Sequence, residues 1–202
     1  MNLPNKLTVL RVFLIPVFVA FYFAQSIPHN YFWALLVFGT ASITDIFDGM
    51  IARRRGLLTD FGALMDPLAD KLLVMSAMVC FVYTGVVHGA VVVVLLSREF
   101  MVTSIRLVGA SKGKVISADR WGKLKTAMQM TWICIGLLGL WLVSLISICI
   151  YGGNFDVLTD SVILALRIFN ALFDILTWVV VAVTALSGLN YLRKNRQLFA
   201  DG

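Results

Sequence analysis

Residues 45–71 read DIFDGMIARRRGLLTDFGALMDPLADK and join two apolar stretches of the sequence. The stretches on either side, residues 31–52 and 62–84, are long enough to cross a bilayer, which takes roughly 20 mostly apolar residues in a helix. Carboxylates stand at the facing ends of both stretches, where a charge inside hydrocarbon is costly and marks function by default. The segment therefore predicts a membrane protein whose site lies where two helices meet at one membrane surface.

The composition of the whole chain also favours a membrane protein. Hydrophobic residues make up 60% of the 202 residues and charged residues 14%, compared with about 45–50% and about 25% in soluble domains. A soluble protein this apolar could not cover its surface with polar groups. The net charge is +6. Because the basic residues stand at the ends of apolar runs, we expect lipid headgroups and anionic substrates as partners, and no nucleic acid.

Six stretches have the length of a membrane span: residues 7–24, 31–52, 62–84, 89–109, 122–150 and 162–192. No repeat or low-complexity linker separates them, so we expect an all-α fold of six transmembrane helices in one domain, residues 1–202. Lys and Arg are absent from 25–31, 84–89 and 151–160 and gather at the other ends of the spans. The positive-inside rule then predicts that both termini face the cytoplasm.

Four aspartates at these cytoplasmic ends share helix faces in pairs. Asp45 and Asp48 are three residues apart, and Asp66 and Asp70 are four apart, so each pair lies on one face of its helix. The short loop between them predicts that the two helices are antiparallel neighbours, and four ionised carboxylates at close range repel unless cations lie between them. Oxygen ligands suit Mg²⁺ or Mn²⁺, and two such ions suit phosphate chemistry.

Other interpretations of the aspartates remain open. Asp66 precedes Pro67 and has the position of a helix N-cap. The carboxylates could also form a structural ion-pair cluster with the arginines of residues 53–55. A divalent-cation transporter is the non-enzyme alternative, but it would spread its carboxylates along a path across the bilayer. Here they gather at one level beside basic residues, which favours a phosphate substrate.

The segment has the pattern Asp45-x-x-Asp48-Gly49-x-x-Ala52-Arg53, then eight residues, then Gly62-x-x-x-Asp66-x-x-x-Asp70. This pattern resembles the signature of the CDP-alcohol phosphotransferase family, with every signature position filled. Residues 2–11, 97–107, 122–126 and 187–191 are similar to bacterial members that make phosphatidylglycerophosphate. The resemblance implies a multi-pass enzyme of the bacterial cytoplasmic membrane. It would transfer the phosphatidyl group of CDP-diacylglycerol to sn-glycerol 3-phosphate and release CMP.

The resemblance also implies roles for single residues. The four aspartates would hold two Mg²⁺ or Mn²⁺ ions, and Asp70 would be the catalytic base that takes a proton from the acceptor's 1-hydroxyl. The family is commonly dimeric, so a homodimer is expected. The CDP-diacylglycerol would lie against Gly49, Ala52, Arg53, Thr59 and Gly62.

An acceptor that carries its own phosphate needs basic residues beside the carboxylates. We favour Arg106 for this role, and the other candidates are Arg98, Lys123, Lys125 and Arg11. Two alternatives stay open, because Lys123 and Lys125 could instead reach to the membrane surface as such lysines often do, and Arg98 could pair with Glu99. The basic residues do not separate glycerol phosphate from inositol phosphate, so phosphatidylinositol-phosphate and cardiolipin synthases remain alternatives within the family.

Two charged residues of the last span have no role in this scheme. Arg167 and Asp174 are seven residues apart on one helix face. Our interpretation is a structural pair, either within the bundle or at a dimer contact.

Overall fold

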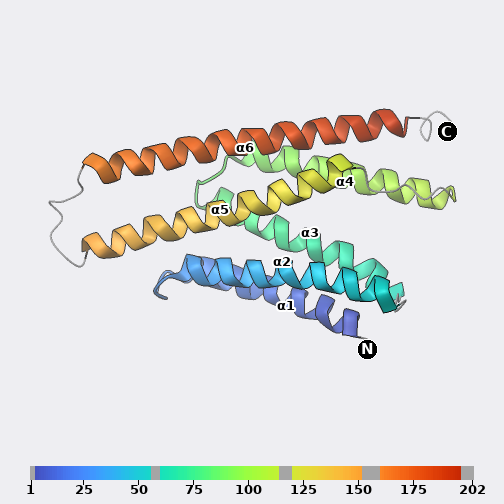
Figure 1. Cartoon of the computed structure of the whole chain (residues 1–202), viewed down its shortest axis with the longest axis horizontal. Helices are drawn as coiled ribbons and strands as arrows, with labels where there is room; N and C mark the ends of the chain where they lie inside the picture. Colours follow the sequence, from blue (N-terminus) through green and yellow to red (C-terminus); the bar gives the residue numbers. More distant parts are fainter. Residues whose placement is uncertain (1–2, 56–59, 114–119, 152–159, 197–202) are drawn as a thin grey trace.

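The computed structural model of the chain describes residues 3–55, 60–113, 120–151 and 160–196, and the regular structure in these ranges is α-helical. Six long helices run back and forth (Figure 1). Their bounds are α1 Leu3–Phe23, α2 Asn30–Arg55, α3 Asp60–Tyr83, α4 Gly89–Ser111, α5 Arg120–Tyr151 and α6 Asp160–Lys194.

Each helix coincides with one of the six expected spans, which confirms the all-α fold. The largest difference is four residues, at the start of α1, where the helix begins at Leu3 and the apolar stretch at residue 7. Most helix ends extend one to four residues beyond the apolar stretch, because backbone hydrogen bonding continues past the last apolar side chain. In the described ranges, two segments are long and apolar enough to cross a membrane, Trp121–Ile146 and Val162–Lys194. Val9–Phe23 and Lys71–Tyr83 are shorter apolar segments.

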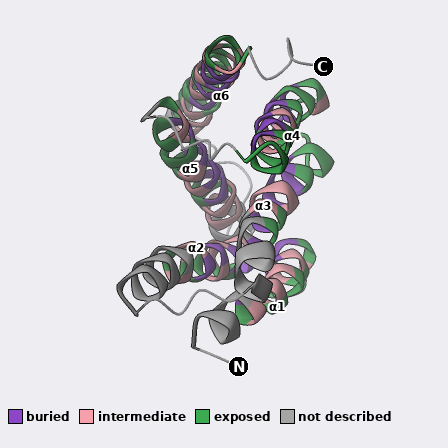
Figure 2. Ribbon diagram, turned by 90° about the vertical axis from the view of Figure 1, so that its right-hand side faces the viewer, coloured by how far each residue is buried: buried purple, intermediate pink, exposed green. Residues whose placement is uncertain are grey.

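The helices form two packed groups, and α5 connects one group to the other. One group is made by α1 with α2 and α3, and the other by α4, α5 and α6, while α5 also packs on α2. Figure 2, which looks along the helices, shows buried positions turned toward neighbouring helices and exposed positions turned outward. Many of the exposed side chains are large and apolar, among them Phe13, Leu107 and Trp178. An outer surface of this kind suits contact with lipid rather than water.

Aromatic side chains fill the centre where the two groups meet. Trp132 of α5 and Phe173 of α6 stack with ring centroids 5.9 Å apart, and Phe81 of α3 lies edge-on to Trp132 at 5.7 Å. The indole Nε1 of Trp132 donates a 2.8 Å hydrogen bond to Thr177 Oγ1. This bond satisfies a polar group that would otherwise be buried without a partner, so α5 and α6 are held in one register.

Two glycines let rings lie directly on the backbone of α5. A Cβ atom on Gly136 would be 2.7 Å from the Phe81 ring, and one on Gly139 would be 2.2 Å from the Phe169 ring. Real Cβ atoms do not approach other atoms so closely. Glycine is therefore needed at both positions for the close approach of α3 and α6 to α5.

The two ends of the bundle differ in chemistry. At one end, on the right of Figure 1, α1, α3 and α5 begin and α2, α4 and α6 end. We call this the basic end, because it is the end where the sequence concentrates Lys and Arg. At the opposite end aromatic residues contact one another, for example Phe23 with Tyr83 at 5.0 Å and Phe32 with Trp141 at 4.9 Å between ring centroids. Such aromatic groups are typical of a membrane–water interface.

Candidate active site

The aspartate positions lie near the basic end. Asp45 and Asp48 belong to the last three turns of α2, and Asp66 and Asp70 to the first three turns of α3. Their side chains are outside the described part of the structure, as are the surroundings of Gly49, Ala52, Arg53 and Gly62, and Thr59 lies in an undescribed segment. The metal and donor sites therefore stay predictions. Among the side chains that are described, no three His, Cys, Asp or Glu residues gather in a possible metal site.

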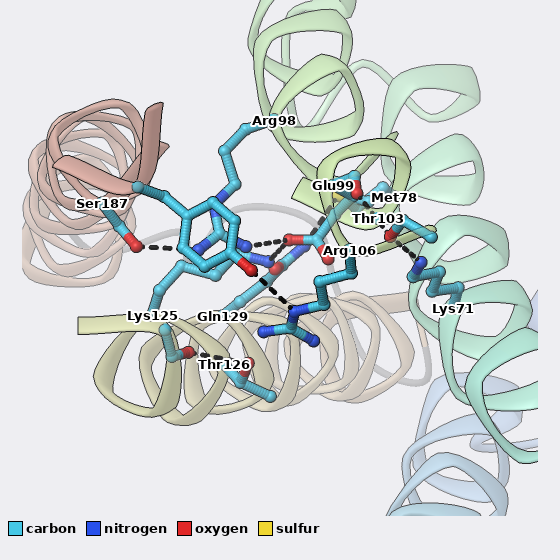
Figure 3. A network of polar contacts seen from close by, with 12 residues as sticks. Lys71, Met78, Arg98, Glu99, Thr103, Arg106, Lys125, Thr126, Gln129 and Ser187 are labelled. Atoms are coloured by element: carbon cyan, nitrogen blue, oxygen red, sulfur yellow. Dashed lines mark hydrogen bonds and ion pairs between the residues drawn. The ribbon is translucent and has the colours of Figure 1, made fainter. Parts of the chain in front are cut away.

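A network of polar side chains lies between α3, α4, α5 and α6 toward the basic end, and Figure 3 shows it from close by. We call it the basic network. Its cations are Lys71, Arg98, Arg106 and Lys125, and its other members are Glu99, Thr103, Ser187 and Tyr191.

Glu99 of α4 lies at the centre of this network. Its Oε1 atom accepts hydrogen bonds from Arg98 Nη1 at 3.1 Å and from Lys125 Nζ of α5. The side chains of Lys125 and Arg98 are only 3% and 10% exposed, whereas that of Glu99 is 23% exposed. Buried cations are stable only when they are paired, so Glu99 is the counter-charge that both of them need.

Arg98 extends the network to α6. Its Nη2 atom donates a 2.7 Å hydrogen bond to Ser187 Oγ. The next residue, Gly188, lies against the stem of Arg98, since a Cβ on Gly188 would be 3.0 Å from Arg98 Cγ. A side chain at position 188 would push the arginine away, so this glycine gives the guanidinium its path to Ser187.

Lys71 connects the network to the aspartate segment. Its Nζ atom donates to Thr103 Oγ1 of α4, and the same hydroxyl donates to the Glu99 backbone carbonyl at 2.8 Å. In the sequence Lys71 directly follows Asp70. The basic network therefore begins one residue from the proposed catalytic base.

Arg106 lies two turns beyond Arg98 on α4 and is exposed. Its Nε atom donates a 3.2 Å hydrogen bond to the hydroxyl of Tyr191 on α6, and its guanidinium carbon lies 5.7 Å from the centre of that ring. Within the described residues, no protein group binds its two Nη atoms; the bond marked at Arg106 in Figure 3 is the one made by Nε. These two atoms form the fork that binds phosphate oxygens in pairs.

A small cavity of about 40 Å³ opens between α3, α4 and α5 beside Glu99. Its polar lining comes from Lys71, Glu99, Lys125, Thr126 and Gln129, and its other walls are apolar. A space of this size holds a few water molecules. The ammonium groups of the network therefore have access to water or to a small polar group.

The structure distinguishes between the basic residues that the sequence predicts as ligands of the acceptor phosphate. Arg98 and Lys125 lie together but are committed to Glu99, while Arg106 is in the same network with its fork open. Lys123 is exposed on α5 and Arg11 is 1% exposed within α1. Lys125 is buried and ion-paired with Glu99, so its side chain does not extend to the membrane surface. The alternative role considered above for Lys123 and Lys125 therefore does not apply to Lys125.

Five network members, Lys71, Glu99, Thr103, Ser187 and Tyr191, were not assigned a site role from the sequence. Lys71 and Glu99 carried a usable signal, because both are charges inside expected spans. Thr103, Ser187 and Tyr191 carried none beyond the family resemblance, since hydroxyl groups are common in membrane helices.

Arg167 and Asp174 lie far from the network, on the half of α6 toward the aromatic end. Both side chains are exposed, and in the described part of the chain no hydrogen bond or ion pair joins them. The expected pair within the bundle is therefore not formed. Asp174 instead lines a cavity of about 300 Å³ between α5 and α6, beside Asn170 and the glycines Gly136 and Gly139.

The electrostatics of the basic network point to an anionic ligand. Of its four cations, Arg98 and Lys125 pair with Glu99, the one carboxylate among the described members, whereas Lys71 donates to Thr103 and Arg106 to Tyr191. Like charges this close repel in a medium of low dielectric constant. An anionic ligand would supply counter-charge for Arg106 and Lys71, which pair with no carboxylate among the described side chains.

Comparisons with known proteins agree with the sequence pattern. The family model described as CDP-alcohol phosphatidyltransferase matches residues 1–186. The CDP-diacylglycerol–glycerol-3-phosphate 3-phosphatidyltransferase of Bacillus subtilis (strain 168) is 34% identical over 205 residues, which cover 96% of this chain and 95% of that protein. The protein of the same name from Rickettsia felis is 33% identical over 199 residues, covering 98% and 97%. A probable phosphatidylglycerophosphate synthase of Mycobacterium tuberculosis is 44% identical over 140 residues, covering 67% and 65%.

Proposed function

The chain belongs to the CDP-alcohol phosphatidyltransferase family, and we propose that it transfers the phosphatidyl group of CDP-diacylglycerol to sn-glycerol 3-phosphate, giving phosphatidylglycerophosphate and CMP. The observation that carries this proposal is the similarity over nearly the whole chain to two proteins named for that reaction. The excess of cations in the basic network supports an acceptor that bears a phosphate. The enzyme thus acts in phospholipid biosynthesis.

The reaction is a displacement at phosphorus. The oxygen of the acceptor's 1-hydroxyl attacks the β-phosphorus of CDP-diacylglycerol, the bond from that phosphorus to the oxygen of CMP breaks, and the hydroxyl proton passes to Asp70. A base placed within hydrogen-bond reach of the hydroxyl accelerates such a step by about 10²–10⁴-fold. Asp70 has the right place in the chain, one residue before Lys71 of the basic network.

The donor set in the aspartate segment fits divalent metal ions. Four carboxylates, Asp45, Asp48, Asp66 and Asp70, provide the oxygen ligands that Mg²⁺ and Mn²⁺ prefer, and their spacings put each pair on one helix face. When bound, two such ions neutralise the diphosphate and the charge that develops on the leaving CMP. The donor's CDP group lies in this proposal against Gly49, Ala52, Arg53, Thr59 and Gly62.

Arg106 and Lys71 are the proposed partners of the acceptor phosphate. Arg106 has an open guanidinium fork, and Lys71 uses one of its three protons for Thr103 and lines the cavity beside Glu99. Arg98 and Lys125 support the site through their pairing with Glu99. Arg11 and Lys123 remain further candidates, one buried in α1 and one exposed on α5.

The basic end faces the cytoplasm in this proposal, with all six helices crossing the bacterial cytoplasmic membrane. The Lys and Arg that the sequence concentrates toward that end, the aromatic contacts at the other and the apolar outer surface support this orientation. Both substrates would then reach the site from the cytoplasmic leaflet and the cytosol. A homodimer is the proposed assembly, on the family resemblance.

The test is CMP release by the purified protein in detergent, with CDP-diacylglycerol, Mg²⁺ or Mn²⁺, and a panel of acceptors. The panel contains glycerol 3-phosphate, inositol phosphate, serine and phosphatidylglycerol. Turnover with glycerol 3-phosphate alone, lost in EDTA, is the expected result. Turnover with inositol phosphate or phosphatidylglycerol instead would assign a different acceptor within the family. A folded protein that releases no CMP but moves divalent cations in liposomes would be a transporter.

A further inference from the structure

Glu99 makes contacts that the transfer reaction by itself does not require. One oxygen of its carboxylate binds Lys125 of α5 and Arg98 of α4, and Arg98 continues to Ser187 of α6. Its backbone carbonyl accepts from Thr103, which also binds Lys71 of α3. A single residue thus connects four helices at the level of the proposed acceptor site (Figure 3).

Burial divides the four cations of the network into two kinds. Lys125 and Arg98 are nearly inaccessible, with 3% and 10% of their side chains exposed. Lys125 also lines the small cavity beside Glu99, but its ammonium group, like the guanidinium of Arg98, already donates to the Glu99 carboxylate. Arg106 is exposed and Lys71 lines the cavity. The two buried cations therefore suit a supporting role, and the two accessible ones suit contact with the ligand.

We infer that Glu99 is a positioning residue of the acceptor site, an inference that rests on the proposed function. Its carboxylate neutralises Lys125 and Arg98 and so fixes α4 against α5 and α6. Arg106 lies eight residues after Arg98 on the same helix, about two turns along. The position of its fork therefore depends on how the Glu99 contacts hold α4. Small displacements of such a group weaken binding and slow the reaction strongly.

The network also suggests an opposite role for Glu99. Its carboxylate could occupy the place of the acceptor phosphate on the cations and compete with the substrate. The two roles predict opposite effects when the charge is removed. Loss of a positioning residue weakens acceptor binding, whereas loss of a competing anion strengthens it.

The experiment compares the wild-type protein with Glu99→Gln, which keeps the shape of the side chain and removes its charge. Binding of glycerol 3-phosphate is measured by titration calorimetry in detergent, and KM is measured for both substrates. We expect Kd and KM for glycerol 3-phosphate to rise by about tenfold. The KM for CDP-diacylglycerol should change by less than about twofold, whereas general damage to the fold would alter both substrates.

The compensating variant Glu99→Gln/Lys125→Met removes one of the two buried cations together with the shared counter-charge. Arg98 keeps its hydrogen bond to Ser187, and the amide oxygen of the substituted side chain can still accept from its Nη1. Replacing a buried ion pair by groups of similar volume is often tolerated. We therefore expect the double variant to bind glycerol 3-phosphate within about threefold of wild type. The double variant also tests the role of Glu99 if Glu99→Gln alone does not fold. Asp174→Asn is the matched control, because it neutralises an exposed carboxylate at the other end of α6 and should change neither constant.

Three results would overturn the inference. These are unchanged acceptor binding in Glu99→Gln, tighter binding in Glu99→Gln, and a loss that the double variant does not reverse, since Lys125 would then contact the ligand itself. Failure of the proposed function is a separate outcome. A wild-type protein that binds glycerol 3-phosphate without turnover, and loses that binding in Glu99→Gln, would keep the role of Glu99 and refute the reaction.

Discussion

Arg106 on α4 and Tyr191 on α6 form a paired contact, in which the arginine Nε donates to the tyrosine hydroxyl at 3.2 Å and the guanidinium carbon lies 5.7 Å from the ring centre. Tyr191 is 4% exposed, so its own position is fixed by packing. The hydroxyl determines the rotation of the guanidinium plane and leaves the Nη fork open. The orientation of the proposed phosphate ligand is thus determined by a second helix.

Removal of that hydroxyl tests the orientation. In Tyr191→Phe the ring stays and the hydrogen bond is lost, which contributes about 0.5–1.5 kcal/mol. We expect KM for glycerol 3-phosphate to rise about two- to tenfold, with KM for CDP-diacylglycerol unchanged. Initial rates of CMP release give both constants. Tyr31→Phe, a tyrosine at the aromatic end, is the control, and an equal effect of both variants would contradict the prediction.

Two substitutions at Arg106 separate the effect of its paired hydrogen-bond donors on phosphate binding from the effect of its charge. Arg106→Lys keeps the positive charge but loses the paired donors, and Arg106→Gln loses both. The expected order of affinity for glycerol 3-phosphate is Arg, then Lys about tenfold weaker, then Gln weaker still. KM measurements on the three proteins check this order. Arg193→Gln, at an exposed cation in the last turn of α6, should leave KM unchanged, and full activity of Arg106→Lys would show that the fork is not used.

The role of Asp70 is tested by a variant that keeps its size. Asp70→Asn can neither accept the hydroxyl proton nor supply the charge of a metal ligand, so we expect CMP release to fall by about 10²–10⁴-fold. EDTA should abolish the activity of the wild-type protein, and Mg²⁺ or Mn²⁺ in excess should restore it. Asp174→Asn is the control for loss of a carboxylate. Activity that survives both EDTA and Asp70→Asn would rule out the proposed metal site.

The close packing at α5 predicts a contrast between two glycines. In Gly139→Ala the new Cβ would be 2.2 Å from the Phe169 ring, whereas in Gly39→Ala nothing lies within 4 Å of it. We expect Gly139→Ala to lose about 1–3 kcal/mol of stability, and Gly39→Ala to be neutral or up to about 1 kcal/mol more stable. Thermal unfolding in detergent measures both. Phe169→Leu should partly rescue Gly139→Ala, and equal Tm values for the two alanine variants would show that the rings do not lie on the backbone.

The elements of the fold follow from the sequence because each depends on local information. Apolar length predicted six helices, and every one forms, with ends that differ by four residues or fewer. The aspartate spacing, the family resemblance and the distribution of Lys and Arg likewise belong to single segments. Hydrophobic length and helix periodicity need no knowledge of the partner helix.

The partner of each cation was decided only by the tertiary structure. The sequence predicted Arg98, Arg106 and Lys125 as candidates for the acceptor phosphate and favoured Arg106, but it could not identify the partner of any of them. Their roles differ because α5 carries Lys125 to Glu99 and α6 carries Ser187 and Tyr191 to the two arginines. Periodicity tells which face of a helix a residue is on. The group opposite that face depends on how helices far apart in the sequence pack, and that packing separated the buried, paired cations from the accessible one.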